Sequence, residues 1–216
     1  MLITWHGHSE FYLEGEQGFT LITDPFDAHV GYPMGEYPAD AVTVSHGHGD
    51  HNFVEKVKGN PVIISQSGEW QAAPDVKITA IPSFHDDAQG AKRGGNLIMK
   101  IEMEGLTCCH LGDLGTALNE DQIRALGQVD ILMVPVGGYY TIDAKLARQT
   151  VHDLKPSVVI PMHFKQQGIN WDWPISDGRD FLELMGAGQA EAMPLLRVTR
   201  GDLSQQPPLV LLSWQK

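Results

Sequence analysis

The sequence predicts an α/β fold in which two β-sheets pack face to face and helices cover the outside. Short apolar or alternating segments recur along the chain with turn residues between them, as strands do. Helical patterns are interleaved with these segments and become more frequent in the second half, which favours two packed sheets with outer helices. The 216 residues contain no low-complexity tract or long linker, so we expect a single domain over residues 1–216.

The expected strands are short runs rich in Val, Ile, Leu and Thr, bounded by Gly, Pro, Asp or Asn. In chain order they lie at 2–5, 10–13, 19–23, 41–45, 62–65, 77–81, 97–103, 106–111, 131–135, 158–161, 195–199 and 209–213.

Helices are expected where apolar residues recur every three to four positions. The segment ending at Leu154 has the best signals, because Asp143 can cap its start and Lys155-Pro156 ends it. The expected helices lie at 52–58, 120–126, 144–154 and 179–185.

The most informative segment is His46-Gly-His-Gly-Asp-His51, which directly follows the strand expected at 41–45. Neutral imidazole and carboxylate are ligands that Zn, Mn and Fe favour. His46 and His48 are two positions apart, so both can face one metal ion, while Asp50 and His51 can turn toward a second. The spacing therefore predicts a metal site where this strand ends.

Further ligands must come from other strand ends, since this short segment cannot complete a site for two metals. A ligand at a strand end has a rigid support, and the loop that follows is free to shape a pocket. Each ion would keep an open position, as catalytic rather than structural sites do. We expect His46, His48 and His85 at one ion, Asp50, His51 and His163 at the other, and Asp113 as the bridge.

The order of these motifs along the chain resembles that of the metallo-β-lactamase-fold hydrolases. Within them, the sequence is similar to a bacterial group described only as metal-dependent or Zn-dependent hydrolases. The narrower match rests on Gly7-His-Ser9, Thr23-Asp-Pro25, Phe84-His-Asp-Asp87 and His110-Leu-Gly-Asp-Leu-Gly115. The resemblance covers roughly residues 1–165 and implies a four-layer αββα sandwich with the metal site at one edge of the sheets. It assigns no role to residues 165–216.

The resemblance also implies a reaction. Two divalent metal ions, with Zn favoured and Mn or Fe as alternatives, would activate a water that attacks an ester, lactone or phosphodiester of a small molecule. Asp50 would be both a ligand and the catalytic proton shuttle.

Three further residues are expected around the ligands. Asp24 ends a strand and can accept an imidazole N–H, the alternative being a turn before Pro25. His8 either lines the pocket or supports a ligand, with a polar turn as the alternative. His110 is expected to be buried behind the ligands, because the metal-binding set is complete without it.

Substrate-binding candidates lie in two loops. Arg93 follows His85 in a glycine-flanked loop and could clamp a carboxylate or phosphate, or simply be solvated. Tyr139 and Tyr140 follow the strand at 131–135 and could bind substrate, although aromatic packing is their default role. Trp171 and Trp173 could wall a pocket or lie at a subunit contact.

Composition limits the partners. A formal net charge of −12 disfavours nucleic acid, whose affinity depends on Lys and Arg, while a small anionic substrate stays open because bound metal ions change the local field. No apolar run is long enough to span a membrane, and the N-terminus does not have the pattern of a signal peptide. The adjacent Cys108 and Cys109 are badly placed to bridge each other. We therefore expect a cytoplasmic protein without disulfides; a homo-oligomer stays open.

Two competing functions remain at this stage. A mononuclear iron thiol dioxygenase can be built on the same fold, and the number and identity of the metals would distinguish it from a hydrolase. A non-catalytic metal-binding module is the other alternative, although a module without activity has no need of a complete ligand set.

Overall fold

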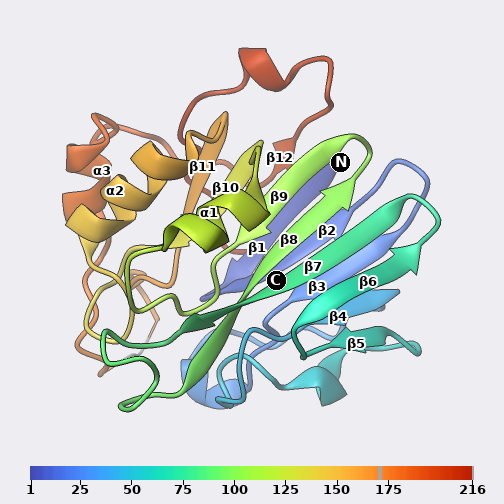
Figure 1. The fold of residues 1–216 in the computed structure, drawn as a ribbon, viewed down its shortest axis with the longest axis horizontal. Coiled ribbons are helices and arrows are strands. Elements are labelled where there is room, and N and C mark those ends of the chain that lie inside the picture. Colours follow the sequence, from blue (N-terminus) through green and yellow to red (C-terminus); the bar gives the residue numbers. More distant parts are fainter. Residues whose placement is uncertain (170–171, 216) are drawn as a thin grey trace.

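The computed structural model describes residues 1–169 and 172–215, which form two six-stranded sheets packed face to face (Figure 1). The first sheet has the strand order β12-β1-β2-β3-β4-β5 and the second β11-β10-β9-β8-β7-β6. The strands of the first sheet are β1 (Leu2–Gly7), β2 (Glu10–Glu14), β3 (Thr20–Thr23), β4 (Ala41–Thr43), β5 (Val62–Ile64) and β12 (Leu196–Arg197). Those of the second are β6 (Gly68–Ala73), β7 (Val76–Phe84), β8 (Gly95–Met103), β9 (Leu106–His110), β10 (Ile131–Pro135) and β11 (Val158–Met162).

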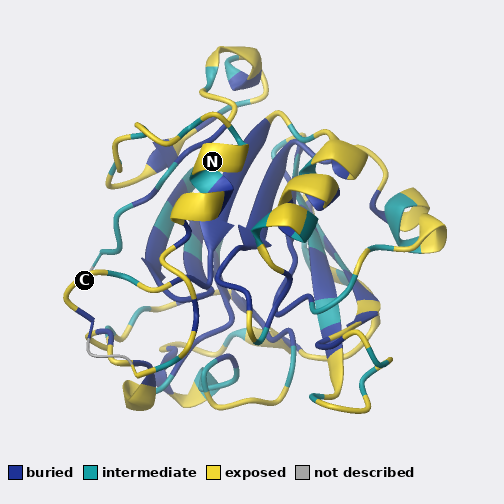
Figure 2. Ribbon diagram, turned by 90° about the vertical axis from the view of Figure 1, so that its left-hand side faces the viewer, coloured by how far each residue is buried: buried dark blue, intermediate teal, exposed yellow. Residues whose placement is uncertain are grey.

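Three α-helices are present in the described residues: α1 (Glu120–Leu126), α2 (Ala144–Leu154) and α3 (Arg179–Leu184). They lie on the side of the second sheet that carries β10 and β11 (Figure 1). Their outward faces are exposed, while the strands beneath are buried (Figure 2). Asn119 and Asp143 cap the starts of α1 and α2 by accepting backbone N–H groups, as expected for Asn and Asp at these positions. None of the helices described is long and apolar enough to cross a membrane.

Alternate residues of the central strands point to opposite faces, and both faces are buried. Leu21 and Ala41 belong to the core between the sheets, whereas Ile22 and Val42 pack on the outer face of the first sheet. That outer face is covered by loop segments, including the short 3₁₀ turn Val54–Lys56, rather than by an α-helix of the described residues. Burial on both faces explains why these strands are continuously apolar in sequence.

Three sequence-based element predictions were wrong. The helix expected at 52–58 is a single 3₁₀ turn, because Lys56 turns inward to Glu10 and Val57 continues in extended backbone. Strand β6 was missed, since it is a partly exposed edge strand with no β-branched residue. The segment 209–213 makes only isolated bridges, through Leu209 and Leu212.

Strand direction brings one set of strand ends together. β1 and β3 are each antiparallel to β2, and β4 is parallel to β3, so these three strands run the same way. In the second sheet β7, β9, β10 and β11 likewise share a direction. The residues that follow the C-terminal ends of these strands can therefore gather at one edge of the sandwich.

Candidate metal centre

Both sheets contribute side chains to one edge of the molecule, where they are tied together. The backbone N–H of His163, after β11, donates to the carbonyl of His8, after β1, at 3.1 Å. The N–H of Leu97 in β8 donates to the carbonyl of Ser45 after β4 at 2.8 Å. These bonds join the two sheets at the point where the predicted metal-binding side chains emerge.

The predicted ligands form two adjoining groups. A third group takes one histidine from each of them together with Asp113. Within each group the possible ligand atoms all lie within 4.8 Å of one another. The groups are His46, His48 and His85; His8, Asp50, His51 and His163; and His46, His51 and Asp113, which lies between the other two. This is the arrangement expected from the sequence, with His8 added.

Asp113 contacts histidines of both groups. Its Oδ1 lies 3.3 Å from His51 Nε2, and its Oδ2 lies 3.2 Å from both His85 Nε2 and His163 Nε2. This central place is the one predicted for the bridging carboxylate.

His8 takes a more direct place than the sequence suggested. It is fully buried, and its Nε2 lies 3.2 Å from Asp50 Oδ2 and 3.2 Å from His51 Nε2. The signal that could have found it was its position directly after a strand that runs parallel to β3 and β4.

Asp24 makes the contact expected of a carboxylate behind a ligand. Its Oδ2 accepts the Nδ1–H of His51 at 2.8 Å, and its two oxygens also accept the backbone N–H and the hydroxyl of Ser45 at 2.7 and 2.6 Å. This bond commits Nδ1 of His51 to Asp24, so that Nε2 faces Asp50 and Asp113.

His110 supports the backbone behind Asp113 and stays outside the cluster. Its Nε2–H donates to the Ser9 carbonyl at 2.9 Å, and its Nδ1 accepts the Gly112 N–H at 3.1 Å. Gly112 has φ +55°, and a Cβ there would lie 2.4 Å from Asn96 Oδ1, so the turn requires glycine. Asn96 Oδ1 in turn accepts the Asp113 N–H at 2.9 Å.

Three buried residues at the site have left-handed backbone, which is unfavourable for residues other than glycine. They are His8 (φ +52°), Asp24 (φ +40°) and His163 (φ +52°). Such strain persists only where the surroundings enforce it, and it is concentrated at functional sites. The strained backbone at these three positions therefore lowers the stability of the fold but points the side chains into the site.

Burial and mutual charge set the protonation states. Burial, aided by neighbouring histidines, lowers the pKa of His8 and of His46 to about 3, so both are neutral at pH 7 and offer lone pairs. Burial alone would raise the pKa of Asp50 and of Asp113, but the facing histidines hold both well below the usual range. Burial opposes a charge on His51 as well, yet the carboxylates of Asp113, Asp24 and Asp50 raise its pKa well above normal.

Hydrogen bonds within the cluster cannot satisfy all of these donor atoms, whereas bound metal ions would. His46 Nε2 faces His48 Nδ1 at 3.0 Å and His8 Nε2 faces His51 Nε2 at 3.2 Å, and two imidazole nitrogens can share only one proton. Buried atoms including Asp113 Oδ1 and His163 Nε2 have no hydrogen-bond partner of good geometry in the described residues. A divalent cation would accept all these lone pairs at once.

The cluster forms the floor of a cavity of about 460 Å³. Arg93, Tyr140 and Trp173 line its walls together with His29, while Trp171 lies outside the described residues. Of the two predicted tyrosines, only Tyr140 is therefore at this cavity.

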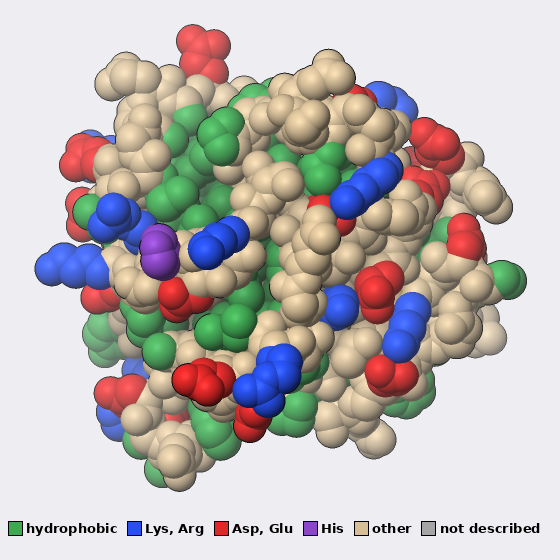
Figure 3. Space-filling model, turned by 45° about the horizontal axis from the view of Figure 1, so that its top comes forward, with side chains coloured by type: hydrophobic (Ala, Val, Ile, Leu, Met, Phe, Trp, Pro, Cys, Tyr) green, Lys and Arg blue, Asp and Glu red, His purple; other side chains and the backbone are tan. Residues whose placement is uncertain are grey.

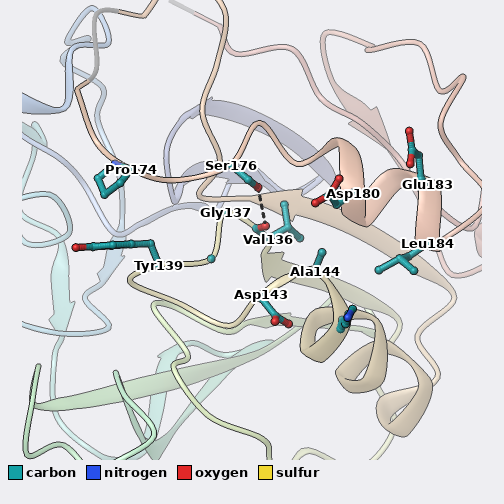
Figure 4. A pocket seen from close by; sticks show the side chains of 12 residues that line it. Val136, Gly137, Tyr139, Asp143, Ala144, Pro174, Ser176, Asp180, Glu183 and Leu184 are labelled. Carbon is teal, nitrogen blue, oxygen red and sulfur yellow. Dashed lines mark hydrogen bonds between the residues drawn. The ribbon is translucent and has the colours of Figure 1, made fainter.

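Tyr139 faces a different cavity, of about 690 Å³, on the other side of the same loop (Figure 4). That cavity lies between Val136, the start of α2 and Leu184, and none of the predicted metal ligands lines it. The chemistry of the site therefore belongs to the smaller cavity, which contains the histidines.

Comparison with known proteins identifies the family of this chain. A family model described as the β-lactamase superfamily domain matches residues 2–163. A UPF0173 metal-dependent hydrolase of Carboxydothermus hydrogenoformans is 30% identical over 94% of this chain and 99% of its own length. One from Pyrococcus furiosus is 28% identical over 85% of this chain and 92% of its own.

Among solved structures, a Thermotoga maritima protein described as a candidate Zn-dependent hydrolase of the metallo-β-lactamase superfamily is 36% identical. Its TM-score is 0.79, and the match covers 98% of this chain and 97% of that one. The match confirms the α/β sandwich expected from the sequence. This chain belongs to the metallo-β-lactamase superfamily and, within it, to the UPF0173 family of metal-dependent hydrolases.

Proposed function

We propose that this protein hydrolyses an ester, lactone or phosphodiester of a small molecule with two divalent metal ions, most readily Zn. The observation that carries the proposal is the buried convergence of histidine and aspartate ligand atoms under an open cavity. The names of the relatives support hydrolysis, and a cavity of about 460 Å³ is of the size that holds small molecules.

His46, His48 and His85 would hold one ion, and Asp50, His51 and His163 the other, with Asp113 between them and His8 within reach of the second group. Bound ions would supply Lewis acidity and a water that is acidic enough to react at neutral pH. Asp24 keeps the His51 ring in one orientation, and the turn held by His110 keeps Asp113 at the centre.

Asp50 is the residue we assign to proton transfer. Both Asp50 and Asp113 line the cavity, but the side chain of Asp50 is 13% exposed, whereas that of Asp113 is 2% exposed and contacts three histidines. Asp50 is held ionised by His51 and His8, so it can accept a proton from an attacking water and later deliver it to the leaving oxygen.

The first test is metal content per chain by plasma mass spectrometry, on protein purified without chelator or a metal affinity column. Near two equivalents of Zn or Mn, together with hydrolysis of model esters, lactones or phosphodiesters that a chelator abolishes, is the expected result. One equivalent of iron with oxygen uptake on thiols would replace the proposal with a dioxygenase. Bound metal with neither hydrolysis nor oxygen uptake would leave the non-catalytic metal-binding module.

A further inference from the structure

One positive side chain at the cavity mouth has no role in the chemistry described so far. Arg93 is the only Lys or Arg among the described residues that line the smaller cavity. No carboxylate of the described residues lies within ion-pair distance of its guanidinium. The neighbouring Lys92, in contrast, pairs with Asp87 at 2.5 Å.

The position of Arg93 is fixed by its loop. The buried carboxylate of Asp86 accepts four backbone N–H groups: those of Ala88 at 2.8 Å, Gly90 at 2.9 Å, Lys92 at 2.9 Å and Arg93 at 2.7 Å. Four backbone donors on one carboxylate hold this loop in a single conformation. The backbone of Arg93 is thus preorganised before any ligand arrives.

The guanidinium itself rests on an aromatic ring. Its central carbon lies 5.5 Å from the centre of the Tyr140 ring, which is cation–π distance. Tyr140 also packs edge-on against Trp173, with ring centres 5.8 Å apart. The aromatic wall of the cavity is therefore angled, and the same cavity is lined by the Arg93 side chain and by the ligand cluster.

The net charge of the protein indicates what the Arg93 guanidinium can contribute. A chain with a net charge of −12 repels anions at long range, although salt screens that field beyond about 8 Å. A local cation away from the metal ions would help to hold an anionic substrate, and a guanidinium matches carboxylate or phosphate with two parallel N–H donors. Arg93, which has no carboxylate partner among the described residues, lines the cavity and can do this.

We propose that Arg93 selects substrates that carry an oxyanion, either a carboxylate or a phosphate monoester, on an apolar body at a distance from the bond that is cleaved. The oxyanion binds the guanidinium, the apolar body packs into the angle between Tyr140 and Trp173, and the scissile group reaches the cluster. The assignment of this substrate class rests on the hydrolase activity proposed above. The binding of an oxyanion at Arg93 does not depend on that activity.

Binding is tested without turnover. Benzoate, phenyl phosphate and benzamide are titrated by calorimetry into chelator-treated protein, so that no metal ion can hold the anion. We expect benzoate or phenyl phosphate to bind more tightly than neutral benzamide. The variant Arg93→Gln should weaken the anion roughly ten- to hundredfold and leave benzamide unchanged. The matched control Lys92→Gln, in the same loop, should change neither.

Turnover provides the second arm, with 4-acetoxybenzoate and its neutral analogue 4-acetoxybenzamide on the metal-loaded enzyme. The ratio of their kcat/KM values should fall at least tenfold in Arg93→Gln and partly recover in Arg93→Lys. If both esters are hydrolysed but Arg93→Gln leaves the ratio and the anion affinity unchanged, this inference is wrong and the hydrolase stands. If neither these esters nor the model lactones and phosphodiesters react, but anion binding still depends on Arg93, the hydrolase fails and the oxyanion site stands. The oxyanion site is overturned if Arg93→Gln changes neither anion binding nor the turnover ratio, or if the protein binds no anion at all.

Discussion

At the scale of single residues, the ability of the site to bind metal depends on which imidazole nitrogens are not already engaged in a hydrogen bond behind the cluster. Asp24 uses up the Nδ1 proton of His51, and Ser45 Oγ lies 2.9 Å from His46 Nδ1. In each ring the second nitrogen then faces the cluster. A metal ion can bind at these second nitrogens: burial keeps the His46 ring neutral, and at His51 the ion would replace the proton that the facing carboxylates favour.

The proton-transfer role of Asp50 leads to a direct prediction. Asp50→Asn keeps an oxygen ligand but cannot accept a proton, and we expect kcat to fall by roughly 10²–10⁴ with metal content unchanged. Asp50→Ala should be at least as damaging. Kinetics on a model ester, with metal analysis of the same samples, measures both. Retained activity at full metal content would remove the shuttle role.

The contact between Asp24 and His51 predicts a change in metal affinity. Asp24→Asn weakens the acceptor for His51 Nδ1–H, and such changes behind a ligand typically cost 10–100-fold in metal affinity. Competition with a chromogenic chelator measures it. Asp27→Asn is the matched control, since Asp27 follows the same strand but its carboxylate accepts the backbone N–H of His29 and contacts the exposed His29 ring instead of a predicted ligand. Equal affinities in the two variants would contradict the assignment.

At the scale of elements, the site depends on strands whose ends meet. A buried ion pair that the sequence does not reveal holds the segment after the motif His46-Gly-His-Gly-Asp-His51 in place. Lys56, only 5% exposed, pairs with the buried Glu10 of β2, and its ammonium lies 3.7 Å from the centre of the Phe26 ring. The other oxygen of Glu10 lies 3.0 Å from His6 Nδ1. The segment is thereby held against the first sheet instead of forming the expected helix.

Breaking this pair should be costly. Glu10→Gln leaves the Lys56 ammonium buried without a counter-charge, and we expect the free energy of unfolding in urea to fall by about 3–5 kcal/mol. The double variant Glu10→Gln with Lys56→Met should recover part of that loss. Glu36→Gln, which removes the partner of Lys58 in an exposed pair, should leave stability nearly unchanged. A loss of similar size in all three would refute the argument.

At the scale of the whole molecule, bound metal should stabilise the fold. The ligands come from both sheets, so an ion bound at the cluster joins the two halves of the sandwich. Ligand at a thousand times its Kd adds about 4 kcal/mol, which for a chain of this size corresponds to roughly 8–16 °C in Tm. Calorimetry before and after chelation, followed by Zn addition, tests this; an unchanged Tm would show that the cluster binds no metal.

Charge also acts over the whole molecule. The surplus of acid is not gathered on the face drawn in Figure 3, where acidic and basic side chains are interspersed.

The sequence by itself determined the two-sheet fold and the places where chemistry emerges. Apolar runs mark the strands, and polar residues directly after them, such as His46, His85 and His163, mark the sheet edge, because burial and hydrogen bonding act locally on each segment. Only the tertiary structure decided what stands next to what. It placed His8 in the cluster, Tyr139 outside the cavity, Lys56 on Glu10 and Arg93 over Tyr140. Those contacts join residues distant in the chain, and they depend on strand direction and on how the two sheets pack, which no local pattern encodes.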